Sequence, residues 1–171
     1  MSEKASHLRG SSIVDRLVQH VGNTARWLCV GLVLLQFAVV LARYIFDAGS
    51  VMAQEAILYL FGTMFMLSIA DALAAGRHVR VDMIYHGLSE RWKRRIDAVG
   101  VIVFLLPLCS FMAYTSWGYV AASWAAREGS REAAGLPGVF LFKTIILISL
   151  ALLILQALAI LVRCLTGKRH D

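Results

Sequence analysis

Four long runs of apolar residues, separated by short polar segments, constrain this chain more than any other feature of its sequence. The runs cover approximately residues 24–46, 53–75, 96–124 and 139–162. A helix needs about 20 apolar residues to cross the hydrocarbon layer of a bilayer. Charged residues make up only 16% of the 171 positions, against about 25% in soluble domains. We therefore predict an all-α integral membrane protein with four transmembrane helices and no separate soluble domain.

The distribution of Lys and Arg predicts how the helices are oriented. Thirteen of these bases lie before or at the start of the first run, between the second and third runs, and in the tail, whereas four lie in or beside the other two connections. Cytoplasmic loops carry the excess of Lys and Arg. We expect residues 1–23 to form a cytoplasmic segment, residues 24–163 the membrane domain, and residues 164–171 a cytoplasmic tail. The net charge of +6 then indicates phospholipid headgroups, and not nucleic acid, as partners of the bases.

The connection between the second and third runs has an amphipathic pattern. Its apolar residues recur at helical spacing, with charged residues between them; they are Val81, Ile84, Tyr85, Leu88, Trp92 and Ile96. This pattern predicts a segment that lies in the membrane interface. Ser89 is a suitable N-cap for a helix that begins at Glu90 and continues into the third run. Pro107 lies inside that helix and is expected to interrupt its hydrogen bonding.

Residues for catalysis or cofactor binding are not apparent. The five histidines lie outside the interiors of the apolar runs, whereas a haem site needs imidazoles that project from helices into the bundle. The three cysteines lack the spacing of metal ligands. We therefore expect no catalytic residue, no cofactor and no metal.

Polar side chains within the apolar runs are few. Glu55 and Asp71 lie near the two ends of the second run, and Gln36 and Gln156 lie in the middle of the first and fourth. The simplest interpretation pairs Asp71 with an arginine or with water, and pairs Glu55 with Arg43 or a base of an outer loop. A contact with a partner subunit is the sharper alternative for Glu55. The two glutamines are expected to hydrogen-bond between helices.

Several short stretches along the chain form a recognisable pattern. In chain order they are 43–46, 54–55, 59–60, 75–82, 88–91, 123–124, 128–130, 135–137 and Lys143. The most specific of them is Gly-Arg-His-Val-Arg-Val-Asp at positions 76–82. With these stretches, about residues 25–163 of the sequence resemble the small permease subunit (DctQ-like) of tripartite ATP-independent periplasmic (TRAP) transporters.

The resemblance implies a role in the bacterial inner membrane. Such systems are secondary importers of organic acids, in which the small subunit braces a large permease subunit and helps to dock a periplasmic solute-binding protein. It implies two groups of contact residues. Lipid headgroups or the large subunit would contact Arg77, His78, Arg80, Asp82 and Trp92. Partners on the periplasmic side would contact Arg43, Glu55, Glu128, Ser130 and Lys143.

Two other functions stay open from the residues alone. The first is the membrane anchor subunit of a respiratory enzyme, although this function would require histidines inside the bundle. A small exporter that acts by itself would need a charged residue deep within a span, and the sequence shows none there.

Overall fold

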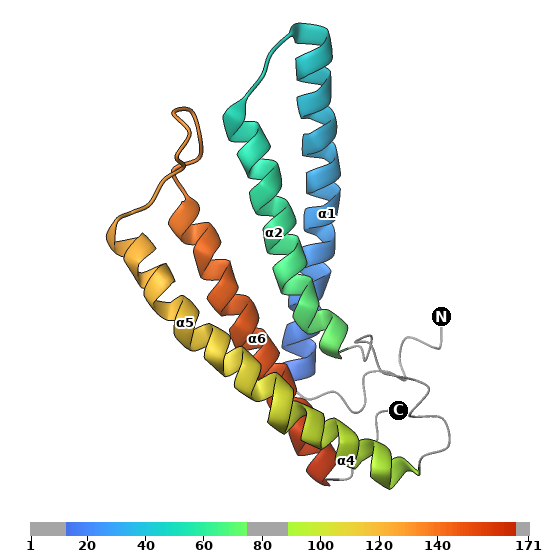
Figure 1. The fold of residues 1–171 in the computed structure, drawn as a ribbon. Helices are drawn as coiled ribbons and strands as arrows, with labels where there is room; N and C mark the ends of the chain where they lie inside the picture. Colours follow the sequence, from blue (N-terminus) through green and yellow to red (C-terminus); the bar gives the residue numbers. More distant parts are fainter. Residues whose placement is uncertain (1–12, 75–88, 167–171) are drawn as a thin grey trace, which may run out of the picture.

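The structure is a computed structural model that describes residues 13–74 and 89–166, and all the regular secondary structure within these ranges is helical (Figure 1). In chain order the elements are α1 (Ile13–Phe46), α2 (Val51–Ala74), α4 (Glu90–Gly100), the π-helical stretch η2 (Val101–Leu105), α5 (Leu106–Ala125) and α6 (Val139–Thr166). Four helices are long and apolar enough to cross a membrane: α1, α2, the continuous helix over Arg91–Ala125, and α6. The prediction of an all-α chain with four spanning helices is therefore confirmed. The cytoplasmic position of the termini and the interfacial segment stay predictions.

A regular seam joins α1 to α2. Along α1, buried or half-buried apolar residues recur at alternating steps of three and four; they are Val18, Val21, Ala25, Leu28, Leu32, Leu35, Val39 and Ala42. This spacing keeps one stripe of a helix against a partner that crosses it at a small angle. The seam begins well before the predicted span, because α1 starts at Ile13 and Val18 is only 1% exposed.

The helices pack in the order α1, α2, α6, α5, with α6 between α2 and α5. They lie closest together at the lower end of the bundle in Figure 1 and splay apart toward the upper end. The main apolar cluster accordingly includes Val18 of α1, Ala70 of α2, Cys109 of α5 and Leu153 of α6. Toward the upper end, α2 and α6 touch through the stacked rings of Tyr59 and Phe142, whose centroids are 4.7 Å apart.

The third spanning helix contains the predicted irregularity. Ser89 is the N-cap residue and the helix begins at Glu90, as predicted, although the Ser89 hydroxyl makes no capping hydrogen bond. Proline has no N–H and cannot donate to the carbonyl four residues earlier. The chain adopts the π-helical stretch Val101–Leu105 just before Pro107 and then returns to an α-helix. The helix thus continues through the proline instead of ending there.

Candidate functional site

The loop between α5 and α6, residues 126–138, is fixed onto α2. It is called the outer loop below, after the side of the membrane predicted for it from the sequence. Glu55 of α2 accepts hydrogen bonds from the Ser130 hydroxyl and, at 2.7 Å, from the backbone N–H of Leu136. The Ser130 N–H donates to the Leu136 carbonyl at 3.0 Å, which closes the loop on itself. A Cβ at Gly135 would lie 2.7 Å from Glu55 Oε2. Only glycine therefore allows this close approach.

A second set of contacts joins the outer loop to α5 and α6. Glu128 binds Lys143 Nζ at 2.5 Å and accepts the Ser123 hydroxyl at 2.7 Å. These hydrogen bonds hold the pKa of Glu128 below its ordinary value of 4.5. Lys143 Nζ also lies 3.9 Å from the ring centroid of Tyr119. Nearby, the Trp124 indole N–H donates to the Thr144 hydroxyl at 2.8 Å. The loop is consequently tied to three helices.

Of the five residues predicted for partners on the periplasmic side, four are thus brought together within the chain. Glu55 and Ser130 bind each other, and Glu128 binds Lys143. Glu55 meets a hydroxyl and an amide N–H here, which differs from the expected pairing with a base. Arg43 instead lies exposed in the last turn of α1. Contact of any of these residues with a partner stays a prediction.

Four of the five residues predicted for the inner side lie outside the described residues: Arg77, His78, Arg80 and Asp82. The fifth, Trp92, is on α4 and is 55% exposed. The guanidinium of Arg95 lies 5.1 Å from the centroid of the Trp92 ring. An exposed aromatic ring next to a base suits the headgroup level of a bilayer, so Trp92 remains available for the predicted contact.

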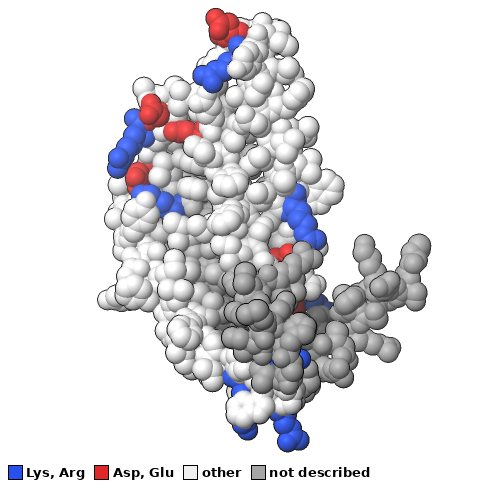
Figure 2. Space-filling view, turned by 45° about the vertical axis from the view of Figure 1, so that its right-hand side comes forward, with Lys and Arg blue, Asp and Glu red and all other residues white. Residues whose placement is uncertain are grey.

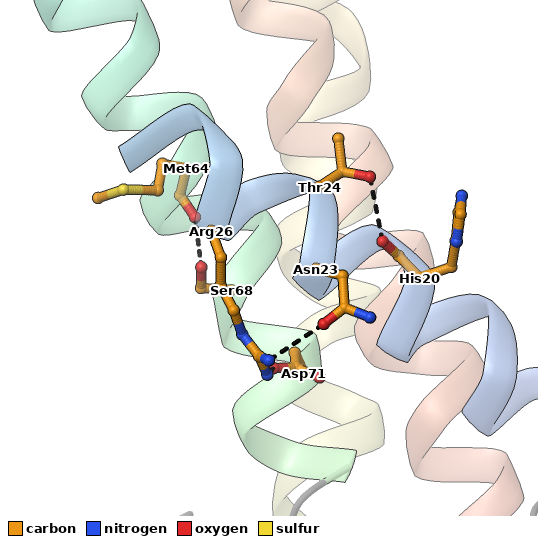
Figure 3. A network of polar contacts seen from close by, with 7 residues as sticks. All are labelled: His20, Asn23, Thr24, Arg26, Met64, Ser68 and Asp71. Carbon is orange, nitrogen blue, oxygen red and sulfur yellow. Dashed lines mark hydrogen bonds and ion pairs between the residues drawn. The ribbon is translucent and has the colours of Figure 1, made fainter. Parts of the chain in front are cut away.

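Near the C-terminal end of α2, a salt bridge joins this helix to α1 (Figure 3). The Arg26 guanidinium reaches from α1 to Asp71 of α2, with Nη2 and Oδ2 3.0 Å apart, and it also donates to the Asn23 side chain at 3.0 Å. The predicted pairing of Asp71 with an arginine is therefore confirmed. Close to this bridge, a Cβ at Gly22 would lie 2.6 Å from the Asp71 Cβ. Glycine at this position lets the two helices approach.

A buried polar cluster joins α1 to α6, and the sequence analysis missed it. Asp15, 4% exposed, accepts a hydrogen bond from the Gln156 amide at 3.0 Å and binds Arg163 Nη1 at 2.5 Å. Gln156 is fully buried, and its predicted role between helices is confirmed. Asp15 fell within the predicted N-terminal segment. The signal that could have found it is the apolar spacing of Val14, Val18 and Val21, which extends the seam of α1 back to the start of the helix.

The polar side chains described above hold the helices and the outer loop together through hydrogen bonds and salt bridges. On the surface, Figure 2 shows few charged side chains, separated by broad uncharged areas. Among the described residues, no group of three or more His, Cys, Asp and Glu could hold a metal ion. An open apolar groove of about 360 Å³ lies between α2 and α6 near the outer loop, lined by residues that include Tyr59, Pro137 and Phe142. Its lining suits packing against another apolar surface.

Comparison with protein-family models matches residues 32–167 to the DctQ component of tripartite ATP-independent periplasmic transporters. No curated protein and no solved structure gives a significant match. The match spans most of the chain and includes α2, α4, α5 and α6 in full. It gives no support to the alternative of a respiratory membrane anchor. The protein is therefore a multi-pass membrane protein of the DctQ family, the small permease component of TRAP transporters.

Proposed function

We propose that this chain is a non-catalytic subunit of a secondary importer of organic acids in the bacterial inner membrane. It braces a large permease subunit, which carries the solute, and it helps to dock a periplasmic solute-binding protein. A sodium gradient drives the import. The family match supports the place of the chain in such a transporter.

The observation that carries this proposal is the internal pairing of three acidic side chains in the spanning helices. Asp15 binds α6, Glu55 binds the outer loop, and Asp71 binds Arg26 of α1. A path for solute and coupling ions needs polar groups that converge near the bilayer midplane. These three carboxylates instead lie toward the ends of their helices and already have partners. The pairing favours a bracing role over transport by this chain itself.

The outer loop supports the proposed docking role. It is held by Glu55 from α2 and by Lys143 from α6, so its shape is set before any partner arrives. A preformed surface avoids the entropic cost of ordering a loop on binding. Arg131 and Glu132 are exposed on this loop and offer charge of both signs to a soluble partner. The predicted contact residues Glu55, Ser130, Glu128 and Lys143 would then act mainly by shaping the loop.

Uptake measurements test the proposal. Removing the gene for this chain should abolish sodium-driven uptake of a labelled organic acid, while the periplasmic protein still binds that acid. Restoring the chain should restore uptake only where the large subunit and the binding protein are also present. Uptake by the large subunit and binding protein without this chain would contradict the bracing role. Uptake by this chain alone would show that it carries solute itself.

A further inference from the structure

One face of the outer half of α1 carries a polar row that nothing in the described chain covers. Asp15, Gly22, Cys29, Gln36 and Arg43 follow one another at intervals of seven residues, so they lie along a single side of the helix. The first two positions are buried, Asp15 against α6 and Gly22 against Asp71 of α2. The last three are exposed. The start of the row therefore lies in an internal interface, and the rest of it lies on exposed surface, where the helices splay apart (Figure 1).

Gln36 is the unusual residue of this row. It lies about 15 Å along the helix axis from Phe46, the last residue of α1, which is about half the thickness of the hydrocarbon layer. Its side chain is exposed, and no hydrogen bond joins it to any residue in the described part of the chain. The neighbouring side chains Val33 and Val40 are apolar and are 58% and 40% exposed. Gln36 is thus an isolated amide on an apolar surface at membrane depth.

Lipid chains offer nothing that could hydrogen-bond this amide, whereas a polar side chain on a neighbouring helix does. We propose that the face of α1 formed by Cys29, Val33, Gln36, Val40 and Arg43 is the surface against which a transmembrane helix of the large permease subunit packs. This inference rests on the proposed function. The partner helix carries a hydroxyl, amide or carboxyl group at the depth of Gln36 and an acidic group level with Arg43.

Charge favours the large subunit over a second copy of this chain. Two copies that paired through this face around a two-fold axis normal to the membrane would have parallel α1 helices. The Arg43 side chains would then meet at the same depth, and like charges at such a contact repel each other. No described residue pairs with Arg43. A partner with an acidic group at the depth of Arg43 would pair with this base, whereas a second copy of this chain would bring another arginine there.

Photo-crosslinking from matched positions on two faces of α1 tests this assignment. A benzophenone amino acid is placed singly at Val33 or Val40 of the tagged, full-length chain in its native membrane. Leu34 and Leu41 are the controls, because they are 63% and 37% exposed but lie about 160° and 140° around the helix from Gln36. After irradiation, Val33 and Val40 should give adducts with the large subunit, and Leu34 and Leu41 should give none.

Three results would overturn the inference while wild-type chain still co-purifies with the large subunit. They are adducts from the Leu34 and Leu41 face alone, adducts that join two copies of this chain, and absence of protein adducts from Val33 and Val40. If wild-type chain retains no large subunit at all, the proposed function itself fails. A substitution tests the role of the Gln36 amide itself. Gln36→Leu removes this amide and should lower the yield of co-purified large subunit by about threefold to tenfold. Leu34→Ala should leave that yield unchanged, and an equal loss in both variants would contradict the assignment.

Discussion

The Glu55 carboxylate accepts the backbone N–H of Leu136 at 2.7 Å, although the two residues are 81 positions apart in the chain. One residue at the start of α2 thus fixes the fold of the loop between α5 and α6, since it also binds Ser130 in that loop. A carboxylate that accepts two hydrogen bonds from one loop has a structural use that does not depend on a partner. Contact of Glu55 with a partner would be additional to this use.

Glu55→Ala is expected to release the outer loop from α2. Losing hydrogen bonds to a charged acceptor should cost about 2 kcal/mol of stability, and the loop should become a site of proteolysis. The measurements are the thermal unfolding of the detergent-solubilised chain and the rate of limited proteolysis within residues 126–138. Glu132→Ala, in the exposed part of the same loop, is the control and should change neither. Equal effects of the two substitutions would contradict the role assigned to Glu55.

The Glu128–Lys143 pair predicts a specific dependence of stability on pH. Because the pKa of Glu128 is lowered in the folded chain, its ionised form contributes stability that is fully present above pH 4.5. This contribution is lost as the pH falls through the lowered pKa. The difference in melting temperature between the wild type and Glu128→Gln should stay constant from pH 7 to about 4.5 and then shrink. A difference that already shrinks between pH 7 and 5, or that persists unchanged to pH 3, would count against the pair.

Asp15 is expected to be important for the contact between α1 and α6. Asp15→Ala leaves the Arg163 guanidinium and the buried Gln156 amide without their acceptor, and removing one partner of a buried pair costs about 3–5 kcal/mol. Asp15→Asn keeps an acceptor for Gln156 and should cost less. Chemical unfolding in detergent measures both. Gln19→Ala, at an exposed position of α1, is the control, and a loss for Asp15→Ala no larger than that of the control would refute this role.

Arg77 and Arg80 lie outside the described residues, and their role remains a sequence-based prediction. Each base near the inner surface is attracted to anionic lipid by about 1 kcal/mol, and the Lys and Arg balance sets the orientation of the helices. Reversing both charges to Glu should therefore impair orientation or assembly, whereas Lys at both positions should preserve them. Accessibility of a cysteine placed in the C-terminal tail reports the orientation. Unchanged topology and uptake in the double Glu variant would show that this motif matters less than predicted.

The sequence could predict the helices because their signal is local. Runs of about 20 apolar residues identify spanning segments without knowledge of the fold, and the structure has a helix at each of them. Ser89 and Pro107 likewise act on their own backbone, so the start of α4 at Glu90 and an irregular turn near the proline were both predictable.

The pairing of the polar groups was harder to predict, because it depends on which helices become neighbours. Asp71 meets Arg26 of α1, and nothing in its local sequence distinguishes that arginine from those that follow Asp71 in the chain. Asp15 falls within the predicted polar N-terminal segment, yet packing of α1 against α6 buries it. Gln36 and Gln156 look alike as mid-span amides. Only the fold shows that Gln156 is enclosed and that Gln36 is exposed.

We propose that this chain works as a bracing subunit of a larger permease, and affinity purification from the native membrane is the sharpest test of that role. A tagged full-length chain is extracted in mild detergent, and the proteins retained with it are identified by mass spectrometry. We expect stoichiometric recovery of a much larger multi-span membrane protein. Consistent recovery of the chain without such a protein, under conditions that preserve other membrane complexes of the same cells, would contradict it.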